Sequence, residues 1–332
     1  MTVPAIPGTY RVIATSIADP TRSAEAALEV IDNKLIGTQT GSSYQNLFFS
    51  SDGQRLAASF SGSYLDVWDT ATRQRLFTIP GSIDGYVYDA KFSPDGTTLA
   101  VASNNAVKQY NAATGTLLRS LSALYSGSVT YSADGTKIAA VGSNINIWNA
   151  VTGAIIRTIV LPQGQNILAF NADASQIATS GNGIAVWDAA TGNLIKQLAS
   201  AGTGFSVVGF SSDESVITHQ NMNINYWSVA TGSIVKRVAL EWPDTGSPTM
   251  IKVTPDGQQV VAYTNNSTLL YWDGVSGALL RTYPLISGGI QTVGISPSSM
   301  LFASGGQINI GTNPPFAQIW RLDTIVRSRS SR

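Results

Sequence analysis

The chain has 332 residues, 20 basic and 20 acidic side chains, one histidine and no cysteine. Because the charge is balanced and no long run of Lys or Arg occurs, the chain lacks the positive surface needed to bind nucleic acid or an anionic membrane. With no cysteine and a single histidine it has no thiolate or multi-histidine metal site, and we expect no cofactor.

No apolar run reaches the length of a transmembrane helix, so we expect no membrane insertion. The first four residues, MTVP, lack the charged and apolar stretches of a signal peptide. Charged residues make up only 12% of the chain, so Ser, Thr, Asn, Gln and Gly must keep the surface polar. This composition is typical of turn-rich β proteins.

The first 33 residues differ from the rest of the chain. Residues 10–17 and 26–31 alternate apolar and polar side chains, which predicts two strands. Residues 8–16, GTYRVIATS, resemble the last two strands of a bacterial immunoglobulin-like domain, in which a Tyr of the penultimate strand anchors a corner. The alternative is that these strands belong to an additional copy of the repeat that follows.

Half of an immunoglobulin-like sandwich leaves strand edges unpaired and an apolar face uncovered. The resemblance therefore implies that the chain begins inside a longer parent protein. It also implies an extracellular or cell-surface location, with a cytoplasmic location as the alternative.

From residue 34 onward the chain repeats about every 40 residues, and each repeat opens with the same motif. An aromatic or aliphatic residue is followed by a polar turn, often Asp-Gly, and then by an apolar pair. Gly takes the positive φ that such a turn requires, and the Asp side chain accepts hydrogen bonds from the following backbone. The motif occurs seven times, at residues 49–57, 92–100, 131–139, 170–178, 210–218, 253–261 and 295–303.

A second motif follows each copy of the first: an alternating strand that ends in an aromatic residue, then a Thr-Gly type of turn and another strand. Six of the seven Trp residues occupy this one position. We interpret them as the filler between adjacent sheets. The position is held by Trp68, Tyr110, Trp148, Trp187, Trp227, Trp272 and Trp320.

Each repeat therefore predicts four short strands, called a to d from the innermost outward. A single sheet cannot bury both faces, so the sheets must stack radially around an axis. The stretches FSPDG (residues 92–96) and VWDAATG (residues 186–192) resemble bacterial WD-repeat proteins. The resemblance covers residues 34–327 and implies an all-β, WD-repeat-like β-propeller of seven four-stranded blades, with eight blades as the alternative.

The predicted domains are residues 1–33, a partial immunoglobulin-like segment or N-terminal strands, the propeller at 34–327, and a tail at 328–332. In a seven-bladed ring both chain ends contribute to one sheet, and we expect residues 35–38 to pair beside the strand that ends near Trp320. An insertion at residues 306–316 in the last repeat is either a contact loop or an ordinary variable insertion.

The d–a and b–c connections of a propeller lie on one face, here called the loop face, and the a–b and c–d turns lie on the other, the turn face. Function usually resides in variable loops held by a rigid scaffold, which favours the loop face. Aromatic side chains supply contact area at low entropy cost, although they can instead pack on loops or plug the channel. The candidate contact residues are Trp242, Tyr86, Tyr88, Tyr125, Tyr44 and Phe205.

We find no nucleophile elbow, phosphate loop, dinucleotide fingerprint or calcium loop, and we interpret the repeated Asp residues as turn formers. His219 in a b–c turn is a general-base candidate, with a surface turn residue as the alternative. We therefore expect no catalytic residue and a monomeric scaffold that binds a protein or glycan partner. The alternatives are a carbohydrate-binding module and a lyase or hydrolase whose central channel brings together Asp89, Lys91 and Lys252.

Overall fold

The computed structural model describes most of the chain, in ranges separated by short gaps. Within them every regular element is a β-strand, which confirms the all-β prediction. No helix in these ranges is long and apolar enough to cross a membrane. The described residues are 8–15, 23–30, 44–60, 64–80, 86–103, 106–122, 127–161, 165–181, 183–200, 206–220, 222–243, 248–254, 256–266, 268–284, 289–296, 301–307 and 316–321.

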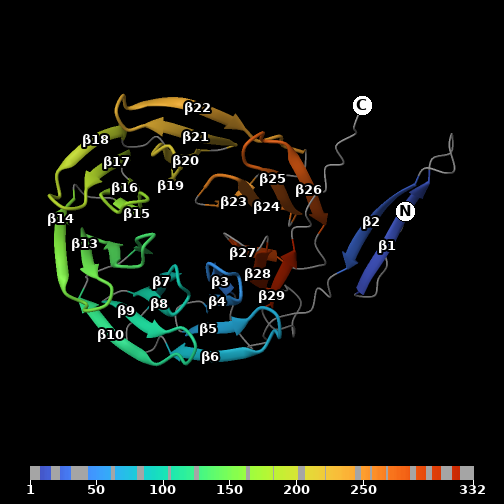
Figure 1. Ribbon diagram of the computed structural model, residues 1–332, viewed down its shortest axis with the longest axis horizontal. Helices are drawn as coiled ribbons and strands as arrows, with labels where there is room; N and C mark the ends of the chain where they lie inside the picture. The colour runs from blue at the N-terminus through green and yellow to red at the C-terminus, as the bar shows by residue number, and fades with distance from the viewer. Residues whose placement is uncertain are drawn as a thin grey trace.

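The strands form a β-propeller (Figure 1). Six sheets have four strands each, paired in chain order with antiparallel neighbours, and we call each of them a blade. The first strand of each blade lies next to the central axis and the fourth lies at the outer rim. Consecutive strands can pair in this way because the a–b and c–d turns are tight and the motif recurs at a fixed period.

The first three blades lie in the N-terminal half of the ring. They consist of β3 (Tyr44–Phe49), β4 (Arg55–Phe60), β5 (Tyr64–Asp69) and β6 (Arg75–Pro80); of β7 (Val87–Phe92), β8 (Thr98–Ser103), β9 (Ala106–Asn111) and β10 (Leu117–Ser122); and of β11 (Ser128–Tyr131), β12 (Lys137–Val141), β13 (Asn144–Asn149) and β14 (Ile155–Val160). The other three consist of β15 (Gln165–Phe170), β16 (Gln176–Gly181), β17 (Gly183–Asp188) and β18 (Leu194–Ala199); of β19 (Ser206–Phe210), β20 (Val216–Gln220), β21 (Asn223–Ser228) and β22 (Ser233–Ala239); and of β23 (Pro248–Val253), β24 (Gln259–Thr264), β25 (Thr268–Asp273) and β26 (Leu279–Pro284).

A three-stranded sheet of β27 (Gly289–Ile295), β28 (Leu301–Gln307) and β29 (Phe316–Arg321) closes the ring. Strand β27 contacts both β23 and β3, so this sheet lies between the last and first blades. The contact with β3 is close: a Cβ added to Gly294 would lie 2.8 Å from the carbonyl oxygen of Leu47. Only glycine therefore fits at this position without a shift of the neighbouring backbone.

The prediction of seven four-stranded blades is wrong, and so is the alternative of eight. The described residues form six four-stranded blades, and the remaining sheet of the ring has three strands. The turn and strand that follow the Trp position in the other repeats have no clear counterpart after Trp320, where the chain reads RLDTIVRS, so the seventh copy did not guarantee a fourth strand. The expected closing segment, residues 35–38, lies outside the described residues, as do residues 308–315 of the predicted insertion.

The N-terminal strands β1 (Gly8–Thr15) and β2 (Ser23–Val30) pair with each other in an antiparallel hairpin. They form a sheet of their own and share no hydrogen-bonded neighbour with the blades among the described residues. The two strands expected from the alternating pattern are thus present, with bounds shifted by one to three residues. The division of the chain at residue 33 and the immunoglobulin-like resemblance stay predictions.

The core consists of apolar seams between neighbouring sheets, and the repeated Trp residues fill them. The side chains of five of the six are described, and each is buried, with at most 7% of its surface exposed. Trp187, for example, packs with Ile145, Ile147 and Ile159 of the preceding blade. The indole N–H of Trp187 donates to Thr179 Oγ1 at 3.0 Å. The interpretation of these residues as filler between sheets is confirmed for Trp68, Trp148, Trp187, Trp227 and Trp272.

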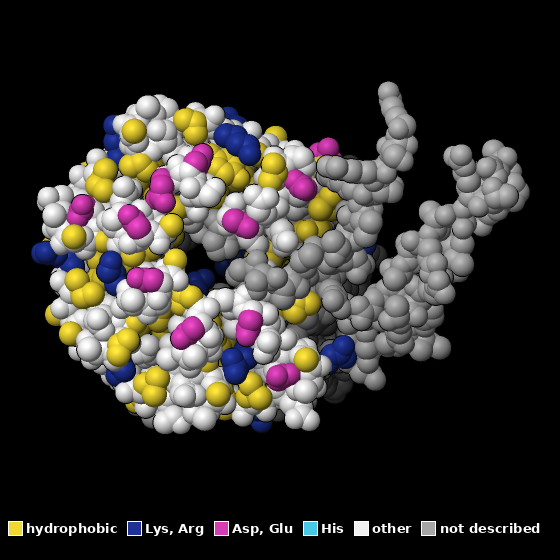
Figure 2. Space-filling model, viewed as in Figure 1, with side chains coloured by type: hydrophobic (Ala, Val, Ile, Leu, Met, Phe, Trp, Pro, Cys, Tyr) yellow, Lys and Arg dark blue, Asp and Glu magenta, His cyan; other side chains and the backbone are white. Residues whose placement is uncertain are grey.

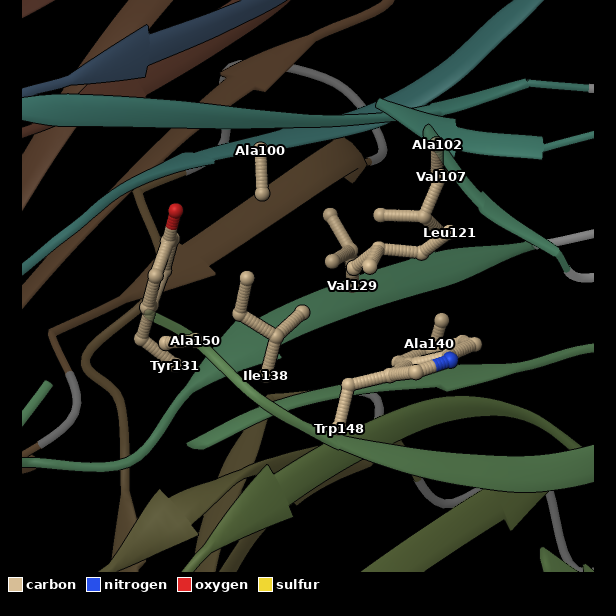
Figure 3. Packing of buried hydrophobic residues seen from close by; sticks show 10 residues of the cluster. All are labelled: Ala100, Ala102, Val107, Leu121, Val129, Tyr131, Ile138, Ala140, Trp148 and Ala150. Atoms are coloured by element: carbon tan, nitrogen blue, oxygen red, sulfur yellow. The ribbon is translucent and has the colours of Figure 1, made fainter. Parts of the chain in front are cut away.

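Figure 3 shows one seam, between the blades β7–β10 and β11–β14. Val107 and Leu121 from one blade point toward Val129 and Trp148 from the other. The Tyr131 hydroxyl at the same seam lies 2.9 Å from Thr98 Oγ1 and accepts from Gln109 Nε2 at 3.2 Å. Apolar burial and these hydrogen bonds together fix the angle between blades, so the loops at the ends of the strands are held on a rigid base.

Candidate functional site

The turn face carries a repeated hydrogen-bonded turn that accounts for most of its acidic residues. In one a–b turn, Asp134 accepts from the Ser132 hydroxyl at 2.6 Å and from the backbone N–H of Thr136 at 3.0 Å. These bonds lower the pKa of Asp134 to about 2, the Ser132 hydroxyl contributing most. In a c–d turn, Asp188 accepts from the backbone N–H of Thr191 at 2.6 Å and from its hydroxyl at 2.9 Å.

The prediction that the repeated Asp residues form turns is therefore confirmed. Figure 2 shows acidic side chains spread around the ring on the face toward the viewer. Each such carboxylate of an a–b or c–d turn is committed to backbone and hydroxyl donors of its own turn. Among the described residues no group of His, Asp and Glu is arranged to hold a metal ion.

The first strands of the blades share an irregularity at their loop-face end. In six of the seven sheets of the ring the register between the first and second strands shifts by one residue near the start of the first strand. Such a β-bulge leaves one residue unpaired and redirects its side chain. The unpaired residues are Gln45, Tyr88, Asn166, Val208, Thr249 and Gln291.

Tyr88 is the one aromatic residue at these bulges, and it stacks on Tyr86 in the connection that leads into β7. The two ring centroids are 6.5 Å apart, with an angle of 25° between the ring planes. Tyr86 is 50% exposed and Tyr88 is 44% exposed. Two of the predicted contact residues are thus brought together as an exposed aromatic pair at the edge of the propeller's loop face.

Trp242 has a different environment from this pair. Its ring stacks on Trp272, with centroids 5.5 Å apart and planes inclined by 16°. It is half-buried against the seam between the blades β19–β22 and β23–β26. Next to it, the Glu241 carbonyl accepts the indole N–H of Trp272 at 2.6 Å. Trp242 therefore contributes to packing between blades, and a role in partner binding stays a prediction.

The side chains of the other three predicted contact residues lie outside the described part of the structure. Tyr44 begins β3 and its backbone pairs with Phe60, but its side chain is outside the described part of the structure. Tyr125 and Phe205 lie outside the described residues.

Asp89, which was a candidate for a channel activity, is held by hydrogen bonds to the next blade. Its Oδ2 accepts from the Ser128 hydroxyl at 2.9 Å and from the backbone N–H of Val129 at 3.0 Å. Its Oδ1 accepts from the backbone N–H of Ala90 at 2.9 Å. The carboxylate thus joins β7 to β11, which gives it a structural role between innermost strands.

His219 lies at the end of β20 and pairs with Ser206 of the innermost strand. Burial of the ring lowers the pKa of His219 to about 4, and the positive charge of Lys252 lowers it further in the same direction. The imidazole is therefore neutral at pH 7. The expectation of a surface residue in a b–c turn is wrong, because His219 lies within β20 and its side chain is only partly exposed.

The sequence indicates Tyr88 as a contact residue because it is aromatic and lies near a variable loop, but it gives no sign of the bulge that exposes the side chain. A bulge depends on backbone register, which the alternating pattern of β7 does not reveal. Lys91 and Lys252 are expected in the channel from their strands alone. Their equivalent positions in two repeats show only when the seven repeats are aligned on the first motif.

One comparison with known proteins bears on the repeat itself. A family model described as WD domain, G-beta repeat matches residues 73–111, which include β6 to β9. No curated protein shows significant similarity to the chain. The match and the propeller architecture together support a WD-repeat β-propeller.

Proposed function

We propose that the chain is a non-catalytic scaffold that binds a protein or glycan partner through its loop face, with Tyr86 and Tyr88 as central contacts. WD-repeat propellers are commonly protein-interaction scaffolds, and this chain has the corresponding fold. The observation that carries the proposal is the stacked, exposed Tyr86–Tyr88 pair.

The pair is suited to binding because little entropy is lost when a partner covers it. Stacking restrains both rings in advance, and the bulge at Tyr88 fixes the backbone from which one of them projects. A partner that covers the two rings removes apolar surface from water, while the two hydroxyl groups accept or donate hydrogen bonds at the rim. Buried Tyr contacts are frequent among the residues that dominate interface energies.

The test begins with a capture experiment on the intact chain and a glycan array, followed by an affinity measurement with the partner or glycan obtained. We expect Tyr86→Ala combined with Tyr88→Ala to weaken binding by at least about 2 kcal/mol, the usual level of a hot-spot residue. Thermal unfolding should be nearly unchanged, because both side chains are exposed.

Two control variants make the result specific. Tyr64→Ala removes an aromatic side chain of similar exposure, 45%, at the start of β5. Val151→Ala removes apolar surface from a c–d turn on the opposite face. The proposal would be contradicted if the Tyr64 variant lost as much affinity as the double variant, or if the double variant bound with unchanged affinity. A glycan ligand in place of a protein would identify the carbohydrate-binding alternative.

A further inference from the structure

Lys91 and Lys252 occupy the same position in two different blades. Each is the last residue but one of the innermost strand of its blade. On the neighbouring strand, Lys91 pairs with Ala100 and Lys252 pairs with Val261. In both repeats this partner is the second residue of the apolar pair. Because register sets height along the propeller axis, the two lysines stand at one level of the ring. The equivalent residues of the other sheets are Phe48, Thr130, Ala169, Gly209 and Gly294.

Both lysine side chains are exposed although they lie on innermost strands. An innermost strand is flanked on its two faces by neighbouring sheets and on its outer edge by the second strand of its own blade. Solvent therefore reaches these side chains through the central channel. Figure 2 shows Lys or Arg side chains within the central opening of the ring. The residues at the same level include two glycines, one alanine and one threonine, which leave the channel open for two long side chains.

In the part of the chain that the structure describes, neither ammonium has a carboxylate of its own as an ion-pair partner. Lys91 Nζ lies 5.9 Å from the centre of the Phe48 ring, which orients the ammonium without cancelling its charge. The nearby carboxylate of Asp89 already accepts hydrogen bonds from Ser128, Val129 and Ala90.

The electrostatics of Lys252 agree with this geometry. The blades beside β23 displace part of the water around Lys252 and so lower its pKa, and the charge of Lys91 lowers it further. The negative charge of Asp89 raises the pKa of Lys252, but by less than the other two effects lower it. Like charges at one level of the channel repel each other, and a bound anion relieves this repulsion.

We propose that the central channel binds a small, multiply charged oxyanion of the phosphate class between the ammonium groups of Lys91 and Lys252. Lysine binds phosphate as a point charge, and charge-assisted hydrogen bonds from two ammonium groups suit a compact tetrahedral anion with several acceptor oxygens. This site is distinct from the tyrosine pair and does not depend on the proposed loop-face function.

The probe is inorganic phosphate, titrated into the purified full chain by calorimetry at low ionic strength. We expect Lys91→Met and Lys252→Met each to lower the phosphate affinity about tenfold to a hundredfold, the value of one charge-assisted hydrogen bond. The double variant should show no saturable binding. Lys196→Met, on the outer strand β18, should bind phosphate as the unchanged chain does.

A parallel titration with succinate distinguishes a phosphate site from a carboxylate site in the same channel. Circular dichroism checks folding, and Lys91→Gln and Lys252→Gln replace the methionine variants if those misfold. Three results would overturn the proposal. The unchanged chain could show no saturable phosphate binding, none of the channel variants could change the phosphate affinity, or Lys196→Met could lower that affinity as much as they do. Binding of succinate but not phosphate, lost in the lysine variants, would also overturn the phosphate assignment.

Discussion

Replacing Trp187 with Ala tests whether the seams between blades carry the stability of the ring. The side chain is 6% exposed and packs with Ile145, Ile147 and Ile159 of the preceding blade. Removing a buried aromatic side chain leaves a cavity between two sheets that are each held in place by their neighbours and cannot collapse freely. We therefore expect Trp187→Ala to lower the free energy of unfolding by about 3–5 kcal/mol.

The indole hydrogen bond contributes a separable part of this loss. Thr179→Val keeps the shape of the side chain but leaves the Trp187 N–H without its acceptor, which should cost about 1–3 kcal/mol. Trp187→Phe combined with Thr179→Val should then cost less than the sum of the two single changes, because both remove the same bond.

Urea unfolding followed by circular dichroism measures these free energies, and limited proteolysis reports whether the blades loosen locally. Val151→Ala, at a residue that is 72% exposed, is the control and should change stability by no more than about 0.5 kcal/mol. A loss below about 1 kcal/mol for Trp187→Ala would refute the reasoning, since it would mean that the seam at this residue carries little of the stability.

Two further predictions concern the channel side of the ring. Asp89→Ala leaves the Ser128 hydroxyl and the Val129 N–H without their acceptor, so urea unfolding should show a loss of about 2–3 kcal/mol; an unchanged midpoint would argue against a link between β7 and β11. The pKa of His219 is lowered from 6.5 to about 4, so between these values the unfolded chain binds more protons than the folded one, and the free energy of unfolding rises with pH. Stability should therefore fall by up to about 3 kcal/mol as the pH drops from 6.5 to 4. His219→Gln should flatten this part of the profile, and an equally steep profile in the variant would assign the effect to other groups.

The fold class and the interior of the blades could be predicted from the sequence because one period controls both. The first motif predicts where the first strand of each repeat ends, as at Phe92 in β7. The repeated Trp position predicts which side chains fill the seams between sheets. The number of four-stranded blades could not be predicted in this way. A fourth strand at the last sheet depends on pairing with a distant segment, and the repeat carries no signal for such pairing.

The candidate site was predictable only in part. Tyr86 and Tyr88 were selected because aromatic residues in variable loops are common contacts, but their mutual stacking depends on a bulge that the alternating pattern conceals. Trp242 was selected because it stands outside the repeat, yet a residue can be unique in sequence and still pack against a repeated one, as Trp242 does on Trp272. Residue type and position in the repeat therefore indicate candidates, whereas burial decides between contact and packing.

Photo-crosslinking is the most direct test of the proposed binding surface. A photoreactive phenylalanine derivative is placed at position 88, or at position 151 as the control on the turn face, and the intact chain is irradiated with the captured partner. The proposal predicts crosslinks from position 88, at the exposed aromatic pair, and none from position 151. Crosslinks from position 151 together with none from position 88 would place the partner on the turn face and contradict the account.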